Sequence, residues 1–190
     1  VFAFMGYFNN DNHIIVIEYV SRYWTPPHAA QFNQAYHPPL YYFVAAPFFR
    51  FGALPAVQSL SLLLSIATLL VIAALLRDLS WMKRPLQLAC LALAALHPQF
   101  VMFGLFISND SLAIFLGALI FYQCRRVQQR GSQSDYVRLG VFLGLGLLTK
   151  AVFLVFVLPV ALFVWLGGKR QRLPRSQIGA RLAAVLACAG

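Results

Sequence analysis

Acidic side chains are rare in this chain of 190 residues, which has only 5 Asp and Glu, and some of them stand where they could do chemistry. Asp11 and His13 lie in a predicted amphipathic helix over residues 11–23, and Asp110 lies between two apolar runs. A carboxylate in such a position can act as a general base or bind a divalent metal ion. A purely structural interpretation stands beside this one: residues 11–23 present a solvated helix face, and Asp110 caps the helix that follows it.

Lys150 is a cation that needs a partner. It follows 11 uncharged residues and precedes 18 more. An ammonium group at membrane depth pairs with a carboxylate, with helix carbonyls or with a lipid phosphate, unless its side chain reaches the interface. Asp110 is in a similar position, because a helix over residues 110–125 rises only about 22 Å and the hydrocarbon core is about 30 Å thick. We therefore expect Asp110 in a hydrated cavity below the interface, or arginines at the other end of its helix that reach out of the membrane.

The composition of the chain indicates what must position these residues. Apolar residues make up 61% and charged residues 11%, whereas soluble domains have about 45–50% and about 25%. This excludes a disordered chain, a coiled coil and an ordinary water-soluble enzyme. The fold class we predict is an all-α, polytopic transmembrane helix bundle. The net charge of +10 is explained by basic loops on the cytoplasmic face, so we expect no nucleic-acid partner.

The spacing of charged residues predicts five spans. If they alternate in direction, 12 of the 15 basic residues fall on one side, which the positive-inside rule makes cytoplasmic. The outer side then holds Arg22, Arg50 and Lys150, together with three of the five acidic residues. The predicted spans are residues 53–76, 85–107, 111–125, 137–150 and 151–168.

Residues 9–52 are predicted to form an outer loop with two juxtamembrane helices. The first is the amphipathic helix over residues 11–23, and the second is a 12-residue apolar segment, residues 40–51, which is too short to span and lies in the interface. Residues 1–8 are predicted to end one span and residues 181–190 to begin another. We expect residues 1–190 to be a single transmembrane module, truncated at both ends.

Three strings in this framework resemble a known family. They are HPPLYYFVAAPFFRFGALPAVQSL, LHPQFVMFGLFISNDSLAIFLGAL and GLGLLTKAVFLVFVLPVAL. In this order they resemble the membrane glycosyltransferases of the C-type (GT-C) fold, in particular the protein O-mannosyltransferase and aminoarabinose transferase group (family 39-like). The resemblance covers residues 6 to 168. It implies an enzyme of the cell (inner or plasma) membrane that moves a sugar from a polyprenyl-phosphate donor to an acceptor on the extracytoplasmic side.

The resemblance also implies roles for individual residues. Asp11 matches an essential acidic residue of the first outer loop and would be the general base, and Asp110 matches an acidic residue at a helix start. Lys150 would meet the lipid phosphate, with help from Arg50 or a divalent metal ion; no cofactor is firmly implied. The second carboxylate common in the family's first outer loop is replaced here by Asn12. The substrate-binding set is His13, His37, Tyr41, Tyr42, Arg50 and Lys150.

Two other functions stay open at this point. In a transporter or flippase, Asp110 and Lys150 would line the path of the substrate, although no internal repeat is visible in the sequence. In a non-catalytic membrane scaffold, the outer carboxylates would be replaceable without effect. The identities of the sugar and of the acceptor do not follow from any residue.

Overall fold

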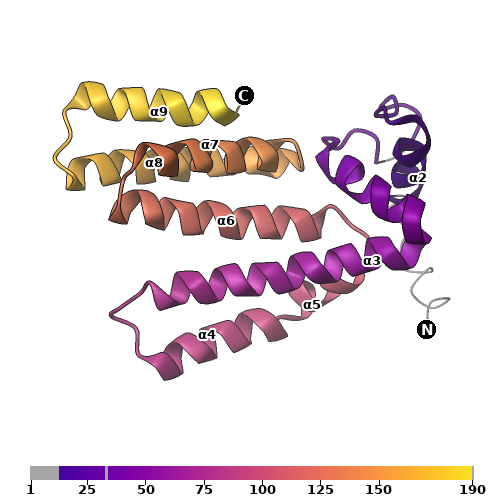
Figure 1. The fold of residues 1–190 in the computed structure, drawn as a ribbon, viewed down its shortest axis with the longest axis horizontal. Coiled ribbons are helices and arrows are strands. Elements are labelled where there is room, and N and C mark those ends of the chain that lie inside the picture. The colour runs from indigo at the N-terminus through magenta and orange to yellow at the C-terminus, as the bar shows by residue number, and fades with distance from the viewer. Residues whose placement is uncertain (1–12, 33, 190) are drawn as a thin grey trace.

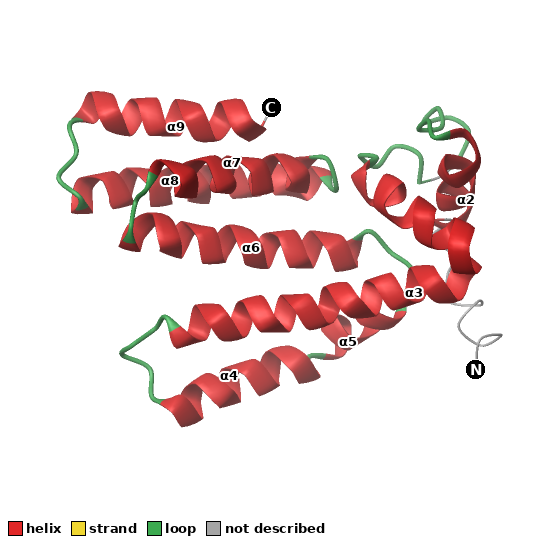
Figure 2. Ribbon diagram, viewed as in Figure 1, coloured by secondary structure: helices red, strands yellow, loops and turns green. Residues whose placement is uncertain are grey.

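The computed structural model describes residues 13–32 and 34–189, and all regular elements in these ranges are helices (Figures 1 and 2). The predicted all-α fold class is therefore confirmed. The elements are α2 (His13–Tyr23), α3 (Leu40–Arg77), α4 (Arg84–Leu96), α5 (Pro98–Leu105), α6 (Asp110–Gln129), α7 (Gln133–Leu147), the 3-10 helix η1 (Ala151–Phe153), α8 (Leu154–Arg170) and α9 (Arg175–Ala189).

The long helices run up and down beside one another, and α2 lies against the beginning of α3 (Figure 1). The turns that follow α3, α6 and α8 all lie at one end of this bundle, which we call the basic end. The opposite end, which we call the site end, holds α2, the start of α6 and the turn between α7 and α8. The basic end is defined by the residues Arg77, Lys83, Arg84, Arg125, Arg126, Arg130, Arg138, Lys169, Arg170, Arg172, Arg175 and Arg181.

Helix α3 contains a break that divides it into two parts. Gly52 and Ala53 have non-helical backbone angles, and Ala53 has a φ of 51°. Pro55 follows at once and cannot donate a hydrogen bond to the preceding turn, so the break falls where helical bonding is already weakened. The first part corresponds in position to the predicted interfacial segment 40–51, and the second to the predicted span 53–76.

Two helices within the described residues are long and apolar enough to cross a membrane, Leu40–Arg77 and Ala151–Arg170. The pair Arg84–Leu96 and Pro98–Leu105 meets the same test together but bends by 54° at its junction. Pro98 lacks a backbone N–H and disfavours a helical conformation at His97, whose ψ is 121°. The segment predicted as one span over residues 85–107 therefore consists of two helices.

The segment between the predicted spans 111–125 and 137–150 is mostly helical. Helix α6 continues to Gln129, and Gly131 reverses the chain with a φ of +61°. Ser132 then begins α7 with a capping box, in which its side chain accepts from the backbone of Asp135 and the Asp135 carboxylate accepts from the backbone of Ser132. This local motif allows the tight turn between the two helices.

Candidate functional site

An ion pair joins two of the predicted site residues at the site end. The Nζ atom of Lys150 lies 2.5 Å from Oδ1 of Asp110, although the residues are 40 positions apart. The other carboxylate oxygen of Asp110 accepts a hydrogen bond from Oγ of Ser108 at 2.8 Å. Both side chains are about one quarter exposed, at 27% and 26%. Of the partners considered for Lys150, the structure therefore provides a carboxylate.

The start of helix α6 presents Asp110 to this pair. Asn109 is the N-cap residue, and Asp110 occupies the first turn, where the positive end of the helix dipole favours a carboxylate. The backbone N–H of Asp110 bonds to the Ser108 hydroxyl at 3.1 Å, so the hydroxyl and the carboxylate hold each other in place. The capping interpretation of Asp110 is thus replaced by a first-turn position with an ion pair.

The turn between α7 and α8 presents Lys150. The backbone N–H groups of Thr149 and Lys150 both bond to the carbonyl of Gly146 at 2.9 Å, and the buried Thr149 hydroxyl donates to Leu145. Gly146 is required here, because a Cβ atom would collide with the ring of Phe153. Lys150 itself has an extended backbone, which interrupts the helix at this point.

The first residue of α3 is tied to the same turn. The backbone N–H of Leu40 donates to the carbonyl of Leu148 at 3.0 Å. This bond brings the segment with His37, Tyr41 and Tyr42 close to the turn that carries Lys150.

A groove of about 530 Å³ extends from the ion pair between α3, α6 and α8. Asp110 and Lys150 are the charged members of its lining, and Thr68 is polar; the rest of the wall is apolar or glycine. A groove with a charged pair at one margin suits an amphiphile that has a polar head and a hydrocarbon chain. The apolar and glycine residues of the wall are Ile72, Leu75, Ala113, Ile114, Gly117, Ala118, Phe121, Val152, Phe153 and Phe156.

Buried polar atoms next to the pair have no hydrogen-bond partner among the described residues. They are both side-chain amide atoms of Asn109 and the hydroxyl of Tyr41, which lies close to Ser61 and Asp110. Leaving a buried polar group unpaired costs about 1–3 kcal/mol, so such groups normally meet water or a ligand. Asn109 is not recognisable as a site residue from the sequence, where it stands before Asp110 in a string typical of a helix start.

A second cluster joins α2 to the start of α3. Nδ1 of His13 lies 3.0 Å from the Tyr42 hydroxyl, which donates its proton to the carbonyl of Gln34 at 3.2 Å. Since a hydroxyl has a single proton, this arrangement makes Nδ1 of His13 the donor in their bond. The ring of His37 stacks on that of His13, with centroids 5.8 Å apart. Three of the predicted binding residues are thus brought together.

Arg50 takes no part in these contacts. Arg50 is exposed and forms no ion pair or hydrogen bond with any residue that the structure describes. Asp11 lies outside the described residues, so its separation from Asp110 stays a prediction. Within residues 13–32 and 34–189, no three His, Cys, Asp or Glu side chains are grouped as a metal site would require.

Comparison with known proteins identifies the family of the chain. The model of one protein family, described as "Dolichyl-phosphate-mannose-protein mannosyltransferase", matches residues 36–189. The chain belongs to this mannosyltransferase family. Its members are integral membrane glycosyltransferases that use a polyprenyl-phosphate-linked sugar donor. No curated protein and no solved structure gives a significant match to the chain.

The family match includes the groove with its ion pair and the start of α3. Asp110, Lys150, His37, Tyr41 and Tyr42 all lie within residues 36–189, whereas Asp11 and His13 precede this range.

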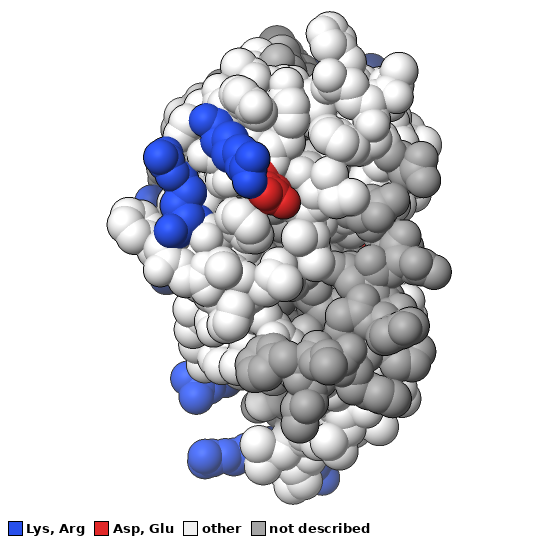
Figure 3. Space-filling view, turned by 90° about the vertical axis from the view of Figure 1, so that its right-hand side faces the viewer, with Lys and Arg blue, Asp and Glu red and all other residues white. Residues whose placement is uncertain are grey.

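Figure 3 shows the site end, where the described surface is mostly uncharged and acidic atoms appear at one place, next to basic atoms.

Proposed function

We propose that the Asp110–Lys150 pair binds the phosphate of a polyprenyl-phosphate-linked sugar, and that the groove beside it binds the first isoprene units. The observation that carries this proposal is the Lys150 ammonium at the margin of an apolar groove, held there by a carboxylate at 2.5 Å. Membership of a family whose donor is a lipid phosphate supports it. The reaction is transfer of the sugar to an acceptor at the extracytoplasmic face.

Lys150 has the right donors for a phosphate. An ammonium group has three N–H donors, and the bond to Asp110 uses one of them, which leaves two for phosphate oxygens. Negative charge increases on the phosphate as the bond to the sugar C1 breaks. A cation already held at this position stabilises that charge without rearranging in the transition state. The carboxylate also offsets the cost of placing an ammonium group at membrane depth.

Asp110 is proposed as a positioning residue, and Asp11 as the general base. Both carboxylate oxygens of Asp110 already accept hydrogen bonds, one from Lys150 and one from Ser108. Asp11 would take the proton of the acceptor as the acceptor attacks C1 from the face opposite the phosphate, which inverts the anomeric centre. The family description names a protein as acceptor, and a side-chain hydroxyl is the matching nucleophile.

The buried polar atoms that have no hydrogen-bond partner, in Tyr41 and Asn109, are proposed to bind the sugar. Tyr41 and Asn109 are buried and are not part of the lining of the groove, so this contact requires the side chains around the pair to move when the donor binds. His13 and Tyr42 already bond to each other, so we place them in the wall of this site, with His37 stacked behind them. Arg50, or a divalent metal ion, would supply a further positive charge near the phosphate.

The test is replacement of Lys150 in the full-length protein, reconstituted in vesicles with a polyprenyl-phosphate-linked mannose. We expect Lys150→Met to lower the rate of mannose transfer at least about 100-fold, the loss typical of removing a preorganised electrostatic contact. Lys169→Met is the matched control, because Lys169 lies at the basic end over the ring of Trp165. Asp11→Asn should abolish transfer while donor binding persists.

Three outcomes would contradict the proposal. They are full activity of Lys150→Met, full activity of Asp11→Asn, and movement of the donor lipid across the vesicle membrane with no mannosylated product. The last outcome would favour a flippase.

A further inference from the structure

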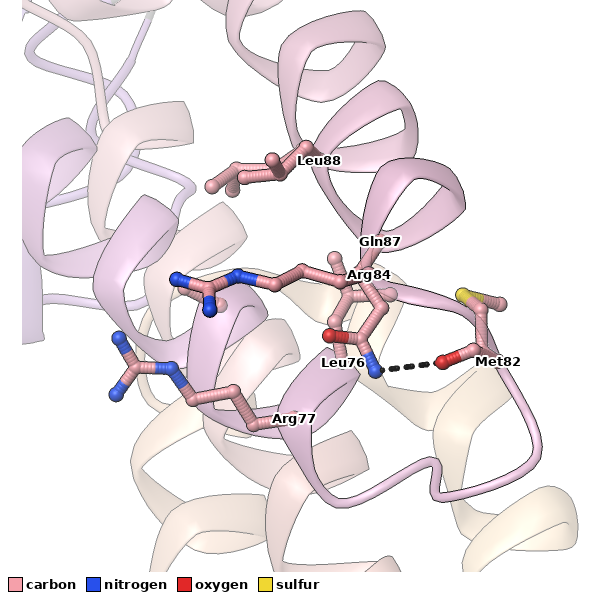
Figure 4. A pocket seen from close by; sticks show the side chains of 8 residues that line it. Leu76, Arg77, Met82, Arg84, Gln87 and Leu88 are labelled. Carbon is pink, nitrogen blue, oxygen red and sulfur yellow. Dashed lines mark hydrogen bonds between the residues drawn. The ribbon is translucent and has the colours of Figure 1, made fainter.

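A second cavity lies at the basic end, at the opposite end of α3 from its first residues. It has a volume of about 490 Å³ and lies between the last turns of α3 and the first turns of α4. Figure 4 shows it from close by. Its lining combines two arginines with a largely apolar wall: Ala73, Leu76, Arg77, Met82, Arg84, Gln87, Leu88 and Leu91.

The two arginines are available to a ligand. Arg77 and Arg84 are exposed, and their guanidinium groups point to the same side of the turn between the helices (Figure 4). Neither guanidinium group forms an ion pair or a hydrogen bond with another described residue. The turn also carries Asp78, but no ion pair joins this carboxylate to either guanidinium in the part of the chain that the structure describes.

The turn that positions them is held in place by α4. Nε2 of Gln87 donates to the carbonyl of Met82 at 3.1 Å and to that of Leu79 at 3.4 Å, and the first of these bonds is drawn in Figure 4. The two cations are therefore presented by a closed turn and not by a loose loop.

We propose that this cavity binds an anionic phospholipid, with its phosphodiester between Arg77 and Arg84 and an acyl chain along the apolar wall. Guanidinium groups bind phosphate through paired hydrogen bonds. Leu88 is 59% exposed, and the other apolar residues of the wall are partly exposed, so an acyl chain could lie against them. Basic pockets between membrane helices bind anionic headgroups, and a soluble anion would leave this wall unused. The site is separate from the donor groove and does not depend on its function.

The test uses the full-length protein in neutral detergent with three additions: phosphatidylglycerol, phosphatidylcholine and inorganic phosphate. The readout is the thermal unfolding temperature, because a ligand of the folded state raises it in a saturable way. We expect phosphatidylglycerol to raise it and the other two to leave it unchanged. Arg77→Gln with Arg84→Gln should weaken the apparent affinity at least about 30-fold, because both charge-assisted contacts to the phosphodiester are lost.

Lys83→Gln is the matched control, because Lys83 precedes Arg84 directly, carries the same charge and is not part of the cavity lining. It should keep the wild-type response. An equal loss in Lys83→Gln, a full response in the double variant, or an equal shift with inorganic phosphate would each overturn the proposal. The first would reduce the effect to general surface charge, and the last would assign the site to a soluble anion.

Discussion

The Lys150 ammonium and the Asp110 carboxylate depend on each other, and this predicts how their variants combine. Asp110→Asn should lower kcat/KM for mannose transfer by roughly tenfold to a hundredfold, because Lys150 loses the group that orients it. If Asp110 acts only through Lys150, the double variant Asp110→Asn/Lys150→Met should be no slower than Lys150→Met alone. Transfer kinetics of the four proteins in the same vesicles measure this.

The stability of these variants provides the control. Lys150→Met leaves a carboxylate without its cation, whereas the double variant removes both charges, so the double variant should unfold at a higher temperature than Lys150→Met. A double variant in which the two losses of rate multiply would contradict the positioning role and assign Asp110 a separate chemical step.

Individual residues could be recognised from the sequence, but their contacts could not. Lys150 and Asp110 are recognisable in the sequence because placing a charged side chain in apolar surroundings costs free energy. Three partners were conceivable for Lys150, and the choice among them depends on how α6 lies against the turn between α7 and α8. That alignment is set by packing between segments 40 residues apart. Asn109 was missed for the same reason, since only the fold shows that its amide is buried and unpaired.

At the scale of elements, the packing of α7 against α9 depends on glycine. A Cβ atom on Gly140 would lie 2.5 Å from the carbonyl oxygen of Val185 and 2.7 Å from Cβ of Cys188. Since a backbone atom cannot move aside alone, Gly140→Ala should push the helices apart and cost about 1–3 kcal/mol, the usual cost of overpacking. Thermal unfolding in detergent should show a lower midpoint.

Gly179→Ala is the matched control for this prediction. Gly179 lies within α9, and a Cβ atom there would meet nothing within 4 Å. Alanine is the better helix former by about 0.5–1 kcal/mol, so this variant should be as stable as the wild type or more stable. Equal destabilisation by both alanines would show that helix contact at Gly140 is not the cause.

The capping box of α7 predicts a dependence of stability on pH. Burial alone would raise the pKa of Asp135, but hydrogen bonds from Ser132 and Gln123 outweigh this effect and lower it. A carboxyl group with a lowered pKa in the folded state stabilises the fold above its unfolded pKa, about 3.9, and this contribution is lost as pH falls through the lowered value. Asp135→Asn should therefore cost about 0.5–2 kcal/mol at pH 7.

The difference between the two proteins is the quantity to measure, because all other carboxyl groups are the same in both. Unfolding midpoints of the wild type and Asp135→Asn should differ most near pH 7, and the difference should shrink as the pH falls below about 3.9. A gap that stays constant over this range would contradict the assigned role of the Asp135 charge.

Element boundaries were predictable where a local residue causes them. The break at Gly52 and Ala53 falls between two segments that differ in length and composition, and the sequence analysis places a boundary there. The bend at Pro98 has an equally local cause, but the apolar run continues on both sides and conceals it. Helix α6 extends past Arg125, and its residue Val127 is fully buried. The end of this helix is therefore decided by packing and not by the charge pattern.

At the scale of the whole molecule, the basic residues separate from the site because successive helices reverse direction. The turns after α3, α6 and α8, together with the helix ends that flank them, carry most of the Lys and Arg, and all of these turns lie at the basic end (Figure 1). Lys150 lies at the other end, with Asp110. The charge pattern alone predicts this separation if the segments alternate, whereas it says nothing about which helices are neighbours.

Which end faces the outside is open to a direct labelling experiment. Ala29 at the site end and Ser134 at the basic end are both exposed, so cysteine can replace either in a background without Cys90, Cys124 and Cys188. The positive-inside rule places the basic end in the cytoplasm. A membrane-impermeant maleimide should therefore label Ala29→Cys in intact cells and Ser134→Cys only after permeabilisation. The reverse pattern would move the donor site to the cytoplasmic face, and labelling of both in intact cells would contradict a bundle that crosses the membrane.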